Sequence, residues 1–283
     1  MVWMLLVLLY GLLKGTREIV KKKSLEKSTV IEVLFFYTLF SFLILLPDSR
    51  NAGGVDLKHL FYIALKSLVI FAAWICSFKA INKMPISYYG ILDLSRVLFS
   101  TLMGAFVLGE VLTKYQIMGL ILVVTGLVML RYRGRKGTMQ KEDVPPYIVA
   151  FALFSCLLNG VSGLMDKILM KDLTSSQLQF WYMAFLVLYY LLYILISRTK
   201  IHIRRSIENY WIWILAVLFV IADRALFIAN GIPDSKVTIM TLIKQSGCIV
   251  TIVAGKVIYH EKNIRHKFLC AAIIVAGIVV AVL

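Results

Sequence analysis

Long apolar segments run through this chain from one end to the other, and they restrict its fold more than any other feature. The chain has 283 residues, of which 60% are hydrophobic, and its mean hydropathy is +0.85. A helix that crosses a lipid bilayer needs about 20 mostly apolar residues. We therefore expect an all-α integral membrane protein. The apolar segments predict ten transmembrane helices, over residues 2–20, 29–46, 60–80, 87–108, 115–130, 147–169, 177–196, 210–229, 237–257 and 268–282.

The N-terminal segment and the four cysteines fit a bundle of membrane helices. The first apolar run has no basic start and no small-residue cleavage site, so we expect the first helix to be retained rather than removed as a secretory signal. Cys76, Cys156, Cys248 and Cys270 all lie inside predicted helices without C-x-x-C spacing. This pattern predicts buried thiols rather than disulfides or a metal site. Enzyme and nucleotide motifs are missing from the sequence, so we expect neither catalysis nor a cofactor.

The net charge of +16 is distributed unevenly along the chain. Seventeen basic residues lie in the odd-numbered connections between the predicted helices, and five lie in the even-numbered ones. Because basic loops favour the cytoplasmic side, this bias predicts cytoplasmic odd connections and, with ten helices, both termini outside. Topology and anionic lipid also explain the basic linker between Arg131 and Lys141, without a nucleic-acid partner. We expect a multi-pass protein of the cell membrane, either monomeric or homodimeric.

A glycine, a glutamate and a second glycine recur at the same intervals in two parts of the chain. They are Gly104, Glu110 and Gly126 in the first part and Gly255, Glu261 and Gly277 in the second. We therefore divide the chain into a five-helix repeat over residues 1–135, a polar linker over 136–146, and a second five-helix repeat over 147–283. An odd number of helices in each half predicts that the halves are inverted. Transporters built this way hold their site between the halves.

The order of these features resembles the drug/metabolite transporter (DMT) superfamily, and within it the EamA-like transporter family. The resemblance rests on residues that match in pairs: Gly15 with Gly160, Lys22 with Lys167, Glu110 with Glu261, and Gly126 with Gly277. It implies a ten-helix carrier that works by alternating access, with a central cavity lined mainly by helices one, three, four, six, eight and nine. The chain departs from the family at Arg96, where many members have a proline. Its charge bias also opposes their usual cytoplasmic termini.

Charged residues inside the predicted helices are the candidate site, because an ionised side chain at mid-bilayer costs about 2.5–3.5 kcal/mol or more. Arg96 and Lys244 lie near the middle of helices four and nine, at roughly equivalent positions of the repeat. Two cations that face one cavity favour a carboxylate or phosphate group on the substrate. The alternative is a structural pair between Arg96 and Asp93, which lies three residues earlier on the same face. Lys244 has no acid in its own helix.

Helix one carries a second charged group. Lys14, Arg17 and Glu18 share one helical face. They either contact the substrate or form an internal pair between Lys14 and Glu18. Asp223 in helix eight is the main candidate for proton coupling, because burial can bring a carboxyl group into the working pH range. A permanent ion pair is the alternative for Asp223, as it is for Asp93 and Glu18.

Two glutamates stand at helix corners in the repeat. Glu110 and Glu261 each precede a new helix. Acids are stabilised near helix N-termini by unpaired N–H groups and by the helix dipole. We therefore interpret both as structural helix-corner residues, and we expect the site earlier in the same helices.

The sequence predicts a secondary transporter that exports or exchanges a small metabolite, with an anionic or zwitterionic substrate favoured. The partners are then the small-molecule substrate and the lipid bilayer, and a gradient or exchange supplies the driving force. A flippase-like carrier of a lipid-linked metabolite is the alternative within the same class. A non-transporting scaffold or sensor is the alternative outside it, and the mid-helix charges of Arg96 and Lys244 argue against that function.

Overall fold

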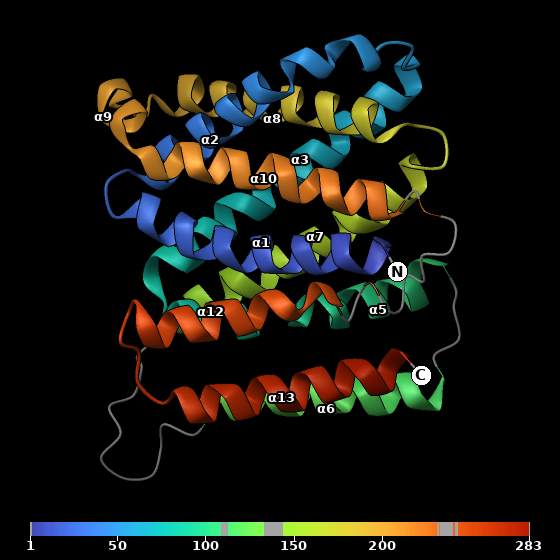
Figure 1. The fold of residues 1–283 in the computed structure, drawn as a ribbon, viewed down its shortest axis with the longest axis vertical. Coiled ribbons are helices and arrows are strands. Elements are labelled where there is room, and N and C mark those ends of the chain that lie inside the picture. Colours follow the sequence, from blue (N-terminus) through green and yellow to red (C-terminus); the bar gives the residue numbers. More distant parts are fainter. Residues whose placement is uncertain are drawn as a thin grey trace.

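The structure of this protein, a computed structural model, is a bundle of α-helices (Figure 1). It describes residues 2–108, 113–132, 144–230, 232, 240 and 243–282, and these ranges contain no strand. Two short elements, the 3-10 helix η1 (Leu46–Asn51) and α9 (Ile203–Glu208), lie in connections. The other helices are α1 (Val2–Leu25), α2 (Val30–Leu45), α3 (Leu57–Lys83), α4 (Ile86–Asp93), α5 (Ser95–Leu108), α6 (Lys114–Tyr132), α7 (Pro146–Leu169), α8 (Ser175–Ser197), α10 (Tyr210–Asn230), α12 (Ser246–Val257) and α13 (Ile264–Val282).

The helices follow the apolar segments of the sequence, and most extend a few polar residues beyond them. Helix four departs from the prediction of one continuous helix over residues 87–108. It is interrupted at Leu94, whose N–H donates to the carbonyl of Ile91, three residues back, instead of four. The described part of helix nine is interrupted in the same way. Lys244 is helical, Gln245 is a turn, and α12 begins at Ser246.

Five helical stretches in the described residues are long and apolar enough to cross a membrane by length and composition. They are Val30–Asn51, Leu57–Lys83, Pro146–Asp166, Ser175–Ser197 and Ile264–Ala281. The first helix, α1, is apolar over its first half but carries lysines, an arginine and a glutamate over its second half. Those charges lower the mean hydropathy of α1, which packs against other helices of the bundle.

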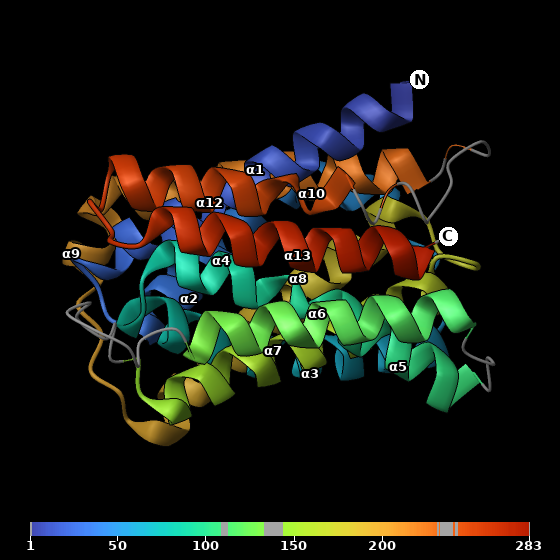
Figure 2. The same ribbon diagram turned by 90° about the horizontal axis from the view of Figure 1, so that it is seen from below.

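Figure 2 shows the bundle from below, with α1, α10 and α12 on one side and α3, α7 and α5 on the other. Each side mixes helices from the two halves of the chain. The described ends of the chain lie at the same end of the bundle (Figure 1). Helix α1 packs against α10 and α12, whereas α7 packs against α3 and against α4 and α5. Helix α2 packs against α8, and α6 packs against α13.

Glycines allow the closest helix contacts in the bundle. A Cβ atom placed on Gly15 of α1 would lie 2.5 Å from the carbonyl oxygen of Gly247 in α12. A Cβ atom on Gly119 of α6 would lie 2.4 Å from the carbonyl oxygen of Gly277 in α13. Small residues at such crossings let membrane helices approach closely. The recurring Gly277 therefore has a packing role between α6 and α13.

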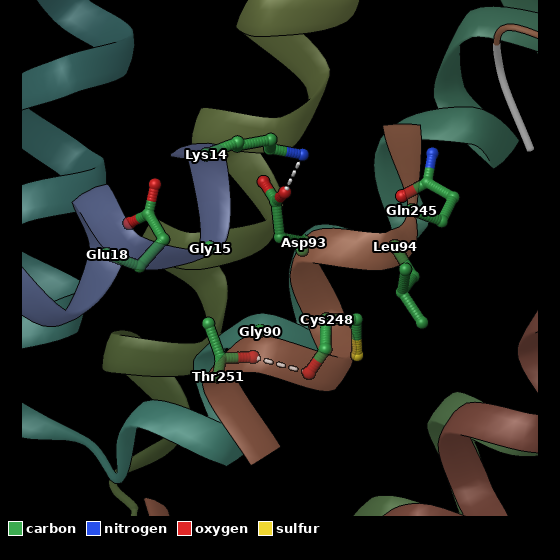
Figure 3. Close-up of a pocket in the computed structure, with 10 residues that line it drawn as sticks. Lys14, Gly15, Glu18, Gly90, Asp93, Leu94, Gln245, Cys248 and Thr251 are labelled. Carbon is green, nitrogen blue, oxygen red and sulfur yellow. Dashed lines mark hydrogen bonds and ion pairs between the residues drawn. The ribbon is translucent and has the colours of Figure 1, made fainter. Parts of the chain in front are cut away.

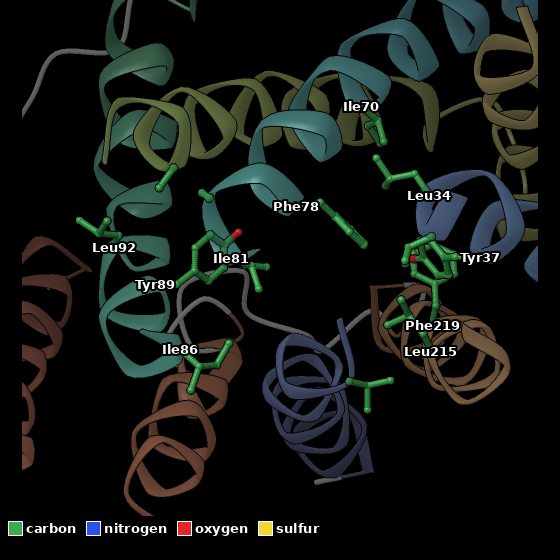
Figure 4. Close-up of a cluster of buried hydrophobic side chains, with 14 of the residues drawn as sticks. Leu34, Tyr37, Ile70, Phe78, Ile81, Ile86, Tyr89, Leu92, Leu215 and Phe219 are labelled. Carbon is green, nitrogen blue, oxygen red and sulfur yellow. The ribbon is translucent and has the colours of Figure 1, made fainter. Parts of the chain in front are cut away.

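The core lies between α2, α3 and α10 and is rich in aromatic rings (Figure 4). The ring of Tyr37 meets that of Phe219 edge to face at 5.4 Å between centroids, and it stacks on Phe78 at 6.4 Å. Such pairs contribute about 0.5–1.5 kcal/mol each beyond the area they bury. The C-terminal half of α1 packs on this aromatic core, because Arg17 lies 5.0 Å over the Phe219 ring and Lys21 lies 5.2 Å over the Phe78 ring.

Candidate functional site

A small cavity lies where α1, α4 and α12 meet, beside the interruptions in helices four and nine (Figure 3). About 250 Å³ of space not occupied by atoms lies there, and part of this space is open to the surroundings. Charged and polar side chains from the region of all three helices line this cavity. The lining residues are Lys14, Gly15, Glu18, Gly90, Asp93, Leu94, Gln245, Gly247, Cys248 and Thr251.

Asp93 is the acid at the centre of this wall, and it binds two cations (Figure 3). Its Oδ2 accepts a charged hydrogen bond from Lys14 Nζ at 2.6 Å, and its Oδ1 accepts one from Arg96 NH2 at 2.8 Å. The structural pair between Asp93 and Arg96, the alternative to substrate contact, is therefore present. The alternative pair between Lys14 and Glu18 does not form, because Lys14 reaches across to helix four.

Glu18 faces the same cavity from one helical turn further along α1. Its Oε1 accepts a hydrogen bond from Lys21 Nζ at 2.8 Å, and both side chains are nine-tenths buried. Its Oε2 is also buried, and it has no hydrogen-bond partner among the described residues. A buried carboxylate oxygen without a partner is costly, so this atom is suited to accept a hydrogen bond from a ligand or from water.

Arg17 and Asp223 form a second ionic contact deeper in the bundle. Arg17 NH1 donates to Asp223 Oδ1 at 3.1 Å, and Tyr182 of α8 donates its hydroxyl proton to Asp223 Oδ2 at 3.0 Å. Asp223 does not pair with its sequence neighbour. Arg224 points to the other side of α10, where it binds Asp48 of η1 and the hydroxyl group of Ser176.

Sequence reasoning missed a third contact, between Lys66 of α3 and Asp166 of α7. Lys66 Nζ lies 3.0 Å from Asp166 Oδ1 and 4.1 Å from the centroid of the Tyr182 ring. The Lys66 side chain is only 2% exposed. Both residues stand out as charges inside apolar segments, which marks them as buried and paired. The sequence does not show that these two residues form the pair, since 100 positions separate them.

Lys244 stands directly before the interruption in helix nine, and it is half-buried. Lys14, Arg96 and Asp166 are the charged groups near enough to interact with it electrostatically. Among the described residues, none forms an ion pair or a hydrogen bond with its side chain. Lys244 therefore lies in the same charged region as Arg96, which binds Asp93.

The corner glutamate Glu261 binds the start of a helix other than α13, the one that follows it in the chain. Its Oε1 accepts a hydrogen bond from the N–H of Ile86 at 2.6 Å, and its Oε2 accepts bonds from the N–H and the hydroxyl group of Ser87. These are the first residues of α4, in the other half of the chain. Lys267 pairs with Glu261 at 3.2 Å, and Glu110 lies outside the described residues.

Comparison with known proteins adds a family and a fold. The family model described as the EamA-like transporter family matches residues 1–132 and 146–283. A solved structure described only as "Crystal structure of protein" is 14% identical with a TM-score of 0.63, and the match covers 99% of this chain and 96% of that chain. At this identity the likeness shows a common fold alone. No curated protein matches this chain significantly.

Proposed function

Since this chain belongs to the EamA-like transporter family, we propose that it is a secondary transporter of a small anionic or zwitterionic metabolite. Members of the family are integral membrane transporters of small molecules. The substrate, the alternating-access mechanism and the location in the cell membrane are our proposals. The observation that carries the proposal is the cavity of α1, α4 and α12, whose polar wall is surrounded by an excess of buried cations.

The charges around the cavity favour an anionic group on the substrate. We define the central ionic cluster as the charged residues that line the cavity together with those that interact with them directly or through one another. Among the described residues, the cations of this cluster outnumber its carboxylates by two. Buried charges are costly unless they are paired, so an anion that enters the cavity gains from both direct contact and relief of this imbalance. The cluster contains Lys14, Arg17, Lys21, Lys66, Arg96 and Lys244, with Glu18, Asp93, Asp166 and Asp223.

The helix packing supports an inverted repeat of five helices in each half. When α1 is exchanged with α7, α2 with α8, α3 with α10, helix four with α12, and α6 with α13, every major contact maps onto another major contact. The contact of α1 with α10 becomes that of α7 with α3, and the contact of α2 with α10 becomes that of α8 with α3. The contacts of α2 with α8 and of α6 with α13 map onto themselves. Rocking of one helix set against the other around a central site then provides alternating access.

Within this mechanism, the residues have distinct roles. Lys14, Arg96 and Lys244 attract the anionic group of the substrate. Arg17 binds the substrate, or it orients the C-terminal half of α1 through its contact with Asp223. Asp223 is the proton-coupling candidate, because it joins α1 and α8 to α10 and its protonation weakens the contact with Arg17.

The test is counterflow in liposomes that contain the purified protein. Labelled organic acids, amino acids and sugar phosphates are screened, and the accepted substrate is measured again with the Lys244→Gln variant. We expect KM for an anionic substrate to rise about tenfold, which corresponds to the loss of one charged contact of about 1.4 kcal/mol. Lys256→Gln is the matched control, because Lys256 lies on the same helix but is exposed. Equal KM values in the two variants would refute the role of Lys244, and no counterflow for any substrate would refute the transporter.

A further inference from the structure

We propose that the ion pair between Lys14 and Asp93 is a link that the substrate anion displaces, with Asp93 acting as a built-in counter-anion in the empty cavity. This inference rests on the proposed function and deepens it, because it assigns the anion position within the site. It also states how binding reaches the helices.

The geometry distinguishes the two cations that Asp93 holds. Arg96 is three residues along from Asp93, so this contact stays within helix four. Lys14 comes from α1, so its 2.6 Å contact joins two different helices. Lys14 and Asp93 both line the cavity, and Figure 3 shows the contact between them at its wall. An anion that enters the cavity therefore meets the inter-helix contact.

The charge count explains why a displacement of this kind is favourable. Asp93 contacts both Lys14 and Arg96, and Lys244 lies near these two cations and near Asp166. Cations gathered in a buried region are unfavourable unless acids balance them. When the substrate carboxylate or phosphate binds Lys14 and Lys244, Asp93 remains on Arg96, and the group of charges gains one more anion.

The displacement has a mechanical consequence. Helix α1 also contacts α12 through Gly15 and Gly247, so it touches both interrupted helices, which also pack against each other. Loss of the contact between Lys14 and Asp93 frees α1 from α4 while the substrate joins it to Lys244 and α12. Binding energy is then used to exchange one helix–helix link for another, which is what a ligand must do to shift a conformational equilibrium.

The test replaces the carboxylate of Asp93 and asks whether a free carboxylate takes its position. The full-length Asp93→Asn variant is purified in detergent, and its melting temperature is measured in sodium acetate and in sodium chloride at equal ionic strength. We expect acetate to raise the melting temperature by about 3–6 °C more than chloride, the shift for a site that is at least nine-tenths occupied. The wild-type protein should show little difference, because Asp93 holds the position.

Asp223→Asn is the matched control. Asp223 also pairs with a buried arginine, but it does not line the cavity, so acetate should stabilise this variant no more than chloride does. Equal responses of the two variants, or no acetate-specific response of Asp93→Asn, would overturn the inference. If Asp93→Asn does not fold, Lys14→Gln/Asp93→Asn replaces it, with Lys14→Gln as the reference. Acetate must then stabilise the double variant more than its reference.

The result separates this inference from the proposed function. Acetate-specific stabilisation without counterflow would leave an anion site in a protein that does not transport the tested substrates. Counterflow of an anion by the wild-type protein, without acetate-specific stabilisation of Asp93→Asn, would retain the transporter and reject the displaced link.

Discussion

Replacement of Glu261 by alanine should destabilise the bundle at the start of α4. The glutamate side chain is 7% exposed, and it accepts hydrogen bonds from two N–H groups at the start of α4 and pairs with Lys267, whose side chain is 3% exposed. Removing one partner of a buried ion pair costs about 3–5 kcal/mol, a range that includes the loss of a helix cap at about 1–2 kcal/mol. With about 2 °C per kcal/mol for a chain of this size, the melting temperature should fall by about 6–10 °C.

Two further variants separate the contributions. Glu261→Gln keeps an oxygen for the N–H of Ile86 but loses the charge. Its melting temperature should therefore fall by about half as much as that of Glu261→Ala. Ser87→Ala removes one hydroxyl donor and should cost about 1 kcal/mol, or about 2 °C. The assay is thermal unfolding in detergent, with all variants heated at one scan rate because unfolding of large proteins is often irreversible.

Glu26→Ala is the reference for a glutamate at the same end of the bundle. Glu26 pairs with Lys23, but its side chain is 50% exposed, and exposed pairs contribute about 0–1 kcal/mol. Its melting temperature should therefore change by less than about 2 °C. If the melting temperature of Glu261→Ala falls no further than that of Glu26→Ala, the contact of Glu261 with the start of α4 does not stabilise the bundle.

Two other predictions concern the cavity wall. A Cβ atom on Gly90 would lie 2.0 Å from Thr251 Oγ1, so Gly90→Ala should lower the free energy of unfolding by about 1–3 kcal/mol, and Gly90→Ala/Thr251→Ala should recover part of that loss. Gly163→Ala is the control, because a Cβ atom there has no neighbour within 4 Å, and it should be neutral or up to about 1 kcal/mol stabilising. Thermal unfolding compares the variants, and equal losses at the two glycines would contradict the close contact. In single-cysteine variants, a small methanethiosulfonate reagent should modify Cys248, which lines the cavity, and should not modify Cys270, which is 0% exposed. Mass spectrometry measures the labelling, and faster labelling of Cys270 would show that the cavity does not give access to Cys248.

The sequence predicts the helices well because apolar length alone defines a membrane helix. It does not predict the interruption of helix four. Leu94 is neither proline nor glycine, the residues that usually interrupt a helix. The interruption lies beside a tertiary contact that the sequence does not show, because Asp93 at the end of α4 binds Lys14 from another helix. Helix four therefore looks continuous in the sequence and is divided in the fold.

The charged residues were predictable as a set, but their partners were not. Each charge inside an apolar segment must be paired or hydrated, so Lys14, Glu18 and Asp93 could be selected from the sequence. Helical spacing then favours the local pair of Lys14 with Glu18. The fold pairs Lys14 with Asp93 of helix four, and Glu18 pairs instead with Lys21 on its own helix. The register of α1 against helix four brings Lys14 to Asp93, and spacing along one helix cannot predict that register.

The two interruptions also decide which positions of the halves correspond. Counting from the prolines that begin helices four and nine pairs Arg96 with Lys244, whereas counting back from the corner glutamates pairs Asp93 with Lys244. Leu94 and Gln245, where the helices are interrupted, both lie sixteen residues before those glutamates, so the second count follows the backbone. Helix four then presents an acid where helix nine presents a base. This acid and this base give the cavity a dipole, so the anionic substrate that we propose should be drawn toward the half that carries Lys244.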